Sequence, residues 1–328
     1  MSRISLELGS GGRLMRDFIA GRIVPAFGDP LLGGLGDAVH LPGRIALTTD
    51  SYVVDPLFFP GGDIGRLAVN GTVNDLVVSG AEPRFLSLAL ILEEGLETQV
   101  LDRVIRSVRA ACRAAGVRVV TGDTKVVRRG QGDKIYINTA GVGRSVARPR
   151  PGKIRRGDKV ILTGPLGDHS LAVMMARGDF GLKSRVRSDC APLLFLLPLW
   201  KSGALWMRDV TRGGLATVLV ELAERLPYPI LIEEDRIPLS RPVRAASELL
   251  GIDPLYMACE GKAVVIAPAA KAAAFLRRVQ AHPLGRQAAI IGAVQDGTGR
   301  PGELLLRTTA GGLRLLEPLT SELLPRIC

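Results

Sequence analysis

The sequence predicts a mixed α/β protein in two halves of similar size. Strand-like apolar runs alternate with amphipathic helical patterns along the chain, and the basic, turn-rich stretch Arg148–Gly157 interrupts this alternation near the middle. The chain has 328 residues, 47% of them hydrophobic, which is enough for two domains that each bury a core.

In the first half, glycines at 9, 11 and 12 form a loop that either bends around a ligand or acts as a linker. The helix predicted at 98–115 is the clearest element, because its apolar residues share one face, including Cys112 as a core residue, and Gly116 ends it. The other elements expected here are a helix at 14–23, turns at 25–36, a strand at 45–50 that residues 51–54 continue, a bend at 58–65, a helix at 67–78, and strands at 84–92, 117–125 and 134–142.

The second half restarts after Gly157 with a strand at 159–163 and a helical region. Thr211 is expected to cap a helix at 215–226, because threonine favours that position. The remaining elements expected are strands at 230–233 and 263–267, helices at 243–250 and 269–281, and strands near residues 290, 305 and 313.

Composition limits the class of function. The net charge of +11 permits an anionic partner, but the basic residues are scattered and only 4% of residues are aromatic, so we expect a small anionic ligand rather than nucleic acid. The four cysteines lie far apart without a C-x-x-C pair, which argues against a zinc site or a disulfide scaffold. No secretory signal and no membrane span is expected, so a cytoplasmic protein is the default.

Four acids share a similar context. Asp50, Asp123 and Asp209 end apolar or glycine-bearing segments, and Asp75 follows Asn74 inside a helix. Carboxylates from several elements can hold Mg²⁺ beside phosphates, whereas each acid taken alone is more commonly a cap or turn residue. The chain has no G-x-x-x-x-G-K-[ST] motif, so it is not a P-loop enzyme.

Lys125 and Glu260 could serve as a phosphate partner and a proton acceptor if they met in one pocket, although surface ion pairing is the commoner role. His169 and His282 have no neighbours that indicate a ligand set, so both are expected to be structural.

The last residues, Leu324-Pro325-Arg326-Ile327-Cys328, end on a thiol. A mobile thiol can carry a group on sulfur, although a frayed tail is the simpler interpretation. Pro325 biases Leu324 toward an extended shape, so we expect these residues to project.

Together these residues resemble one family. The motifs are Thr48–Ser51, Phe58–Asp63, Gly71–Leu76, Glu93–Gly95, Thr121–Lys125, Arg208–Leu215 and Pro325–Cys328. In this order, and nearly from end to end, they resemble the HypE family of hydrogenase maturation factors, the carbamoyl dehydratases. Two positions depart from the family pattern, Leu8 where histidine is common and Cys259 where asparagine is usual.

The resemblance implies the PurM-like fold of the aminoimidazole ribonucleotide synthetase superfamily. It divides the chain into an N-terminal segment with the glycine loop (1–40), a sheet domain that binds ATP and forms a homodimer (41–148), a ferredoxin-like domain with extra helices (155–316) and a mobile tail (317–328) that ends in Cys328.

The resemblance also implies a site that holds ATP and Mg²⁺. It assigns Asp50, Asp75 and Asp209 to the metal and phosphates, and Cys328, Lys125 and Glu260 to catalysis. The further residues expected around the nucleotide are Phe59, Gly61, Gly62, Asn74, Asp123, Thr124, Thr211, Arg212 and Gly213, together with the Gly9–Gly12 loop.

The activity implied is ATP-dependent dehydration of a carbamoyl group on Cys328 to a thiocyanate, which supplies cyanide to the iron of [NiFe] hydrogenase. The implied partners are the carbamoyltransferase HypF and an iron-bearing HypC–HypD complex. Selenophosphate synthesis on the same fold would require a cysteine in the N-terminal glycine loop, whereas the first cysteine here is Cys112. Thiamine-phosphate kinase or purine-pathway activity would leave Cys328 unexplained. A non-enzymatic thiol carrier is the alternative from another class, and it would not need Mg·ATP.

Overall fold

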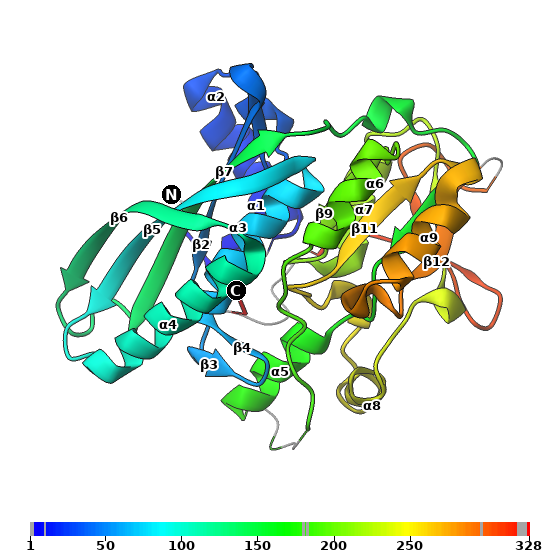
Figure 1. The fold of residues 1–328 in the computed structure, drawn as a ribbon. Coiled ribbons are helices and arrows are strands. Elements are labelled where there is room, and N and C mark those ends of the chain that lie inside the picture. The colour runs from blue at the N-terminus through cyan, green and yellow to red at the C-terminus, as the bar shows by residue number, and fades with distance from the viewer. Residues whose placement is uncertain (1–2, 10, 179–180, 182–183, 296–297, 320–326) are drawn as a thin grey trace.

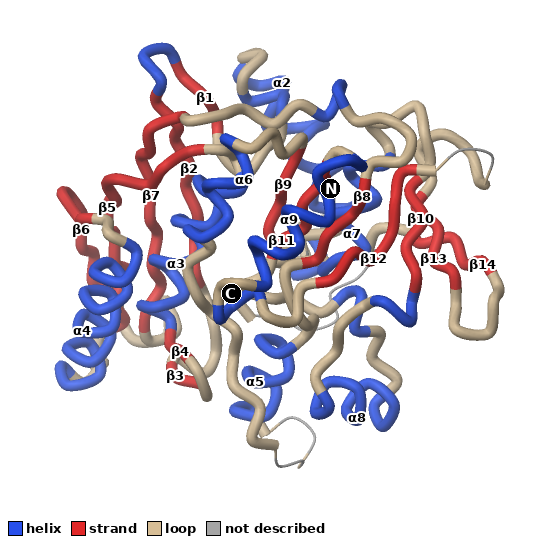
Figure 2. Tube along the Cα trace, turned by 45° about the vertical axis from the view of Figure 1, so that its right-hand side comes forward, coloured by secondary structure: helices blue, strands red, loops and turns tan. Residues whose placement is uncertain are grey.

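The computed structural model describes residues 3–9, 11–178, 181, 184–295, 298–319 and 327–328. This part of the chain forms two large β-sheets and a small two-stranded one, with helices between and around the large sheets, which confirms the mixed α/β class (Figure 1). The two large sheets lie on opposite sides of the molecule, with helices α3 (Ile64–Val78) and α6 (Leu197–Lys201) between them (Figure 2). The division of the chain at residues 40, 148 and 316 stays a prediction.

The first half is a five-stranded sheet in the order β1-β2-β7-β5-β6, covered on one face by α3 and α4. Its strands pair antiparallel except β5 and β6, which run parallel because α4 connects them. The elements are α1 (Arg13–Phe18), a π-helical turn (Ile19–Ile23), α2 (Val24–Phe27), β1 (Val39–Leu41), β2 (Ile45–Tyr52), β3 (Phe58–Phe59), β4 (Gly62–Asp63), α3 (Ile64–Val78), β5 (Ala81–Glu93), α4 (Thr98–Ala115), β6 (Arg118–Val127) and β7 (Ile135–Ser145).

The second half is a seven-stranded sheet in the order β14-β13-β10-β12-β8-β11-β9. Side chains alternate across it, so Val264 packs with α7 on one face and Val265 with α5 and α9 on the other. The elements are β8 (Lys159–Leu162), α5 (Asp168–Arg177), α6 (Leu197–Lys201), β9 (Trp206–Asp209), α7 (Gly214–Ala223), β10 (Ile230–Glu233), α8 (Arg241–Leu250), β11 (Ala263–Ala267), α9 (Ala272–Gln280), β12 (Ala289–Val294), β13 (Leu304–Arg307) and β14 (Leu313–Leu316).

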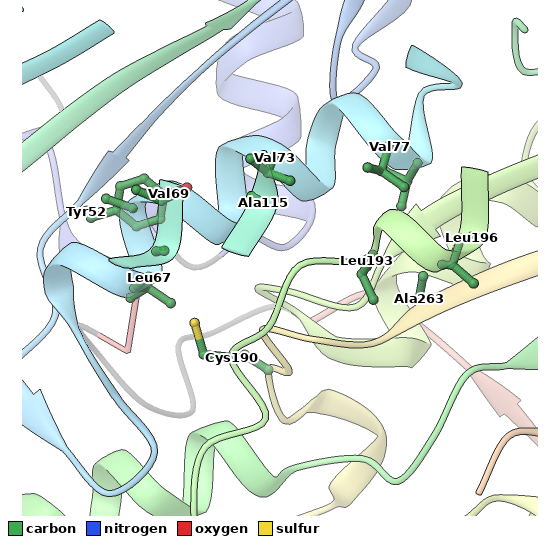
Figure 3. Close-up of a cluster of buried hydrophobic side chains, with 14 of the residues drawn as sticks. Tyr52, Leu67, Val69, Val73, Val77, Ala115, Cys190, Leu193, Leu196 and Ala263 are labelled. Atoms are coloured by element: carbon green, nitrogen blue, oxygen red, sulfur yellow. The ribbon is translucent and has the colours of Figure 1, made fainter. Parts of the chain in front are cut away.

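Helix α3 joins the two halves into one core. Its apolar residues Leu67, Val73 and Val77 belong to the same buried cluster as Leu193 and Leu196 of the second half (Figure 3). Nearly every residue of α3 is buried, so its apolar residues are not confined to one side and its sequence shows little amphipathic contrast. The functional residues of the two halves are therefore held in a fixed relation to each other.

Most of the expected elements are confirmed, and the errors are local. Thr211 does not cap α7, because the N-cap residue is Gly213 in a left-handed conformation and no side chain caps the helix. The first helical segment continues past Pro25 to Phe27, since proline fits the first turn of α2. Asp63 caps α3 by accepting bonds from the backbone N–H groups of Gly65 and Arg66, a signal that the sequence interpretation missed.

Candidate functional site

Aspartates from four separate segments surround a cavity of about 370 Å³, here called the acid cavity. Asp50 comes from β2, Asp75 from α3 and Asp209 from the end of β9, while Asp37 precedes β1. The structure thus gathers three of the acids named from the sequence, and it adds Asp37. Their role as metal ligands stays a prediction.

The acids of this cavity hold protons more tightly than free carboxyl groups. Burial raises the pKa of Asp75 well above its usual value, and the charges of Asp209, Asp50 and Asp37 raise it further. Burial, followed by the charge of Asp37, raises the pKa of Asp209 to about 8. Thr48 donates a hydrogen bond to Asp75 (Oγ1 to Oδ2, 2.8 Å) and opposes this effect. The cavity is therefore suited to a ligand that brings positive charge.

Arginines border the same cavity. Arg208 lies between Asp37 (Nε to Oδ1, 2.9 Å) and Glu221 (Nη1 to Oε2, 2.6 Å), so it neutralises part of the acidic charge. Arg212 approaches Asp50 (Nη2 to Oδ1, 3.9 Å), and Thr211 lines the cavity beside it. Within the described ranges, no three His, Cys, Asp or Glu side chains are grouped closely enough to hold a metal ion by themselves. Oxygen ligands from phosphates and water would have to complete any coordination shell.

Glu260 is buried near these groups, and its carboxylate atom Oε1 has no hydrogen-bond partner. Its backbone is firmly held: its N–H donates to Asp189 (Oδ1, 3.0 Å), and its carbonyl accepts from Ala191 (N, 3.3 Å). Burial raises the pKa of Glu260 well above its usual value, and the charges of Asp209, Asp189 and Asp50 add to this, while Arg212 opposes it. Glu260 thus has a fixed position and a free oxygen for exchanging a proton.

Asn74 does not line the acid cavity, and its expected place beside the nucleotide stays a prediction. Its Nδ2 donates to the backbone carbonyls of Ala191 (3.1 Å) and Glu260 (3.3 Å), and its Oδ1 accepts from the backbone N–H of Leu193 (2.8 Å). The buried side chain is occupied by these bonds, so it ties α3 to the segment that carries Glu260. The sequence could not show this, because the bonded groups are backbone atoms more than a hundred residues away.

Asp123, Thr124 and Lys125 do not join the acid cavity within one chain. They lie on β6, the exposed edge strand, three strands away from the β2 strand that carries Asp50. Neighbouring strands are about 4.8 Å apart, so the separation across the sheet is roughly 14 Å. Asp123 pairs in register with Ala89 and Lys125 with Ile91, on the sheet face that points away from α3. Lys125 instead forms an exposed ion pair with Asp123 (Nζ to Oδ2, 3.2 Å).

Phe59, Gly61 and Gly62 line a different cavity, of about 510 Å³, beside α4. Their expected place beside the nucleotide stays a prediction. The glycine loop does reach the acid cavity through Gly11, where an added Cβ would lie 2.5 Å from the side chain of Arg212. Gly213 turns the chain into α7, and a Cβ there would meet the side chain of Thr217 at 2.6 Å.

The described end of the tail is docked rather than projecting. Ile327 is buried, and its carbonyl lies 2.6 Å from Nε2 of His169. The backbone oxygen of Cys328 accepts a hydrogen bond from the N–H of Val53 (3.2 Å), the residue that follows β2. The charge of Cys328 is the largest cause of the raised pKa of Arg212, a residue that lines the acid cavity, and Val53 follows the strand that carries Asp50. The expected extension at Leu324 and Pro325 falls outside the described residues.

The sequence interpretation missed two groups of residues at this site. Asp37, Arg208 and Glu221 form a half-buried charge cluster, and apart from the place of Arg208 in the Arg208–Leu215 motif their only sequence signal is their charge. His169 and Val53 hold the chain end, yet nothing in their local sequence indicates contact with residues 327 and 328.

The chain matches known proteins over nearly its whole length. Residues 36–145 match the family model of the AIR synthase related protein N-terminal domain, and residues 155–301 match that of the C-terminal domain. The carbamoyl dehydratase HypE of Rhodobacter capsulatus is 46% identical, over 99% of this chain and 98% of the relative. This chain belongs to the HypE family. It is a PurM-like, AIR synthase-related carbamoyl dehydratase of hydrogenase maturation.

Solved structures of HypE proteins share this fold. A HypE in complex with ATP superposes with a TM-score of 0.83 at 44% identity, covering 99% of this chain and 100% of the other. The HypE of a HypE–HypF complex superposes with a TM-score of 0.86 at 39% identity, covering 92% of this chain and 99% of the other. In the described part of this HypE chain, no helix is long and apolar enough to cross a membrane.

Proposed function

We propose that this HypE protein uses ATP to dehydrate a carbamoyl group carried on its own Cys328. The observation that carries the proposal is the docking of Cys328 on Val53, just after the strand that carries Asp50, together with the charge interaction of Cys328 with Arg212 of the acid cavity. A thiol near a cavity of acids and arginines can meet a nucleotide bound there. Family membership and the ATP complex of a relative support ATP as the reactant.

The reaction exchanges a poor leaving group for a good one. The carbamoyl oxygen attacks the γ-phosphorus of ATP, the bond to ADP breaks, and the oxygen becomes part of a phosphate ester. Two N–H protons then leave and the C–O bond breaks, so that phosphate departs and a thiocyanate remains on sulfur. ATP and the carbamoyl group are thereby converted into ADP, phosphate and the nitrile, and the oxygen lost from carbon leaves in phosphate.

Glu260 and Arg212 supply the groups that this sequence needs. The free Oε1 of Glu260 can accept an N–H proton, and its backbone bonds keep it in place while it does so. Arg212 provides positive charge near Asp50 and the Cys328 segment, where phosphoryl charge would develop. Thr211 lines the same cavity and would contact the phosphates.

The acids fit a divalent cation. Asp75 and Asp209 have raised pKa values partly because they and their acidic neighbours repel one another, a cost that a bound cation would remove. Mg²⁺ held by Asp50, Asp75 and Asp209 would neutralise phosphate charge when bound.

We further propose that the protein is a homodimer and that each β6 strand completes the site of its partner. The outward face of the first sheet exposes Ile45, Leu47, Phe85 and Ile91, an apolar surface next to the exposed Thr121–Lys125 segment. Burying this face against a second copy would remove it from water. Asp123, Thr124 and Lys125 would then act on the other chain's nucleotide, which reconciles their distance from the acids with the role that the family resemblance implies.

The chemistry also requires partners and a compartment. A transferase must load the carbamoyl group on Cys328, and the solved complex of a relative with HypF supports HypF as that partner. An iron-bearing acceptor, which we take to be HypC–HypD, must receive the cyanide, and the cytoplasm is the expected compartment.

Intact-protein mass spectrometry tests the reaction. The carbamoylated protein should lose the mass of one water when Mg·ATP is added, and peptide mapping should place the loss on Cys328. Cys328→Ala, which leaves the acids untouched, should keep ATP binding and show no such change. A carbamoylated, ATP-bound protein whose mass does not change would refute the proposal and favour a thiol carrier.

A further inference from the structure

The Ile327–Cys328 segment is held at two points, one from each half of the molecule. From the first half, the backbone N–H of Val53 donates to the backbone oxygen of Cys328 (3.2 Å). From the second half, His169 at the start of α5 contacts the Ile327 carbonyl through Nε2 (2.6 Å). The side chain of Ile327 is buried in the core that the two halves share.

The contacts of His169 define its tautomer. A carbonyl oxygen only accepts, so Nε2 carries the proton and donates it to Ile327. On the other side of the ring, Nδ1 lies 2.8 Å from Oγ of Ser188, which itself accepts a bond from the N–H of Cys190 (3.1 Å). The Ser188 hydroxyl therefore donates to Nδ1. This chain of bonds runs in one direction, from the backbone to Ser188, to His169 and to the tail.

The ring itself is fixed in place. His169 is fully buried, and Phe59 packs against it edge-on, with ring centroids 5.3 Å apart and an interplanar angle of 82°. Burial lowers the pKa of the imidazole, so the ring is neutral at ordinary pH. The acid groups that face the ring include Asp189, whose charge raises the pKa of His169, but by less than burial lowers it.

We propose that His169 is a positioning residue that docks the Ile327 carbonyl and thereby places the Cys328 thiol beside the acid cavity. The inference rests on the proposed function, because docking matters there only if Cys328 carries the reacting group. His169 touches neither the sulfur nor the cavity's carboxylates in the contacts described. His169 thereby sets the fraction of molecules in which the Cys328 thiol is docked.

The test measures how readily the Cys328 thiol is reached by a reagent. The full-length protein is alkylated with iodoacetamide over a range of pH, and mass spectrometry follows each cysteine. The limiting rate at high pH reports access alone, because the thiol is then fully ionised. Cys112, Cys190 and Cys259 are buried and serve as internal references for intact folding.

His169→Phe keeps an aromatic ring against Phe59 but loses the donor to Ile327. We expect it to raise the limiting alkylation rate of Cys328 about three- to tenfold, the range for losing one ordinary hydrogen bond. His169→Gln offers an N–H donor in a similar place and should restore most of the protection. Ser188→Ala, which removes only the hydroxyl that fixes the tautomer, should give a smaller rise.

His282→Phe is the matched control. His282 also packs against an aromatic ring, Phe195, at a centroid distance of 4.4 Å, but its bonded neighbour is Leu284 and not the tail. It should leave the Cys328 rate unchanged. Equal Cys328 alkylation rates in the unmodified protein and in His169→Phe would overturn the proposal. A His169→Gln protein whose Cys328 reacts as fast as in His169→Phe would overturn it too.

These measurements need neither ATP nor a carbamoyl group, so they separate this inference from the proposed reaction. Unchanged ATP affinity in His169→Phe, combined with a slower loss of water from carbamoylated protein, is the expected outcome for a positioning residue. If the unmodified protein showed no dehydration at all, the proposed function would fail even though the docking result stood. A His169→Phe protein with weakened ATP binding would instead assign the histidine to the acid cavity and would also overturn the proposal.

Discussion

Replacing Asn74 by alanine distinguishes the structural role of this residue from the nucleotide-binding role expected from the sequence. The side chain makes three hydrogen bonds to the backbone of the second half, at Ala191, Leu193 and Glu260. The change should destabilise the protein and displace Glu260, while ATP affinity should change little. A nucleotide ligand would show the opposite pattern.

The expected loss of stability can be estimated from these bonds. In Asn74→Ala the buried N–H of Leu193 loses its acceptor, which costs about 1–3 kcal/mol. The Glu260 carbonyl keeps the hydrogen bond from the Ala191 N–H, so less free energy is lost at this carbonyl. The Ala191 carbonyl loses its hydrogen-bond donor, and removal of the amide leaves an empty space. Together these effects cost roughly another 1 kcal/mol, which gives a total of about 2–4 kcal/mol.

Urea unfolding of the protein without ligand measures this free energy, and isothermal calorimetry measures ATP affinity. Asn138→Ala is the control, because Asn138 also donates hydrogen bonds, to the Asp50 backbone (2.9 Å) and to Ser51 (3.0 Å), but it is exposed. It should lower stability by no more than about 0.5 kcal/mol. A stable Asn74→Ala protein with tenfold weaker ATP binding would refute the structural interpretation.

Three further predictions follow from the acid cavity and from the exposed β6 strand. Asp75→Asn should weaken Mg·ATP binding at least tenfold in calorimetry, because a ligand is lost, and unchanged affinity would place the metal elsewhere. The pKa of Asp209 is about 8 when folded against 3.8 for a free carboxyl, so the folded state binds more protons between these values. Without divalent cations, the free energy of unfolding measured with urea should therefore fall by several kcal/mol as pH rises from about 4 to 8. In Asp209→Asn this free energy should depend less on pH. Finally, the Lys125→Ala and Cys328→Ala proteins should each be inactive alone. After subunit exchange, their mixture should recover about a quarter of the unmodified protein's turnover per chain, since half of the random dimers would contain one complete site. No recovery would place Lys125 outside the partner's site.

The fold could be predicted from the sequence because its periodic patterns are strong. The helix at 98–115 and the strand beginning at Ile45 have the expected type and nearly the expected bounds. The helix has one apolar face, and the strand opens on the apolar run Ile45–Leu47. The cap of α7 was mispredicted because threonine's preference for that position was overridden by the glycine turn at Gly213. Local preferences decide helix ends only where the chain is free to follow them.

The site was only partly predictable, for a physical reason. The sequence context singles out four acids, and the family resemblance assigns three of them, Asp50, Asp75 and Asp209, to one site; these three do line one cavity. Motif membership does not reveal on which side of a sheet a residue lies, so the resemblance groups Lys125 with Glu260 although, within one chain, Lys125 lies on the exposed face of an edge strand. Likewise, His169 contacts a segment 158 residues away, and no local pattern encodes such a contact.

The strength of the docking contacts matches the proposed delivery of a group on sulfur. Two hydrogen bonds to neutral donors contribute about 1–3 kcal/mol, and burial of the Ile327 side chain contributes roughly 2–3 kcal/mol. Ordering the backbone of residues 327 and 328 costs about 2–4 kcal/mol. The net preference for docking is therefore at most a few kcal/mol, so the docked and released states are both accessible. A charged contact at His169 would hold the segment more tightly, whereas a neutral imidazole lets Cys328 enter for dehydration and leave again for the acceptor of its cyanide.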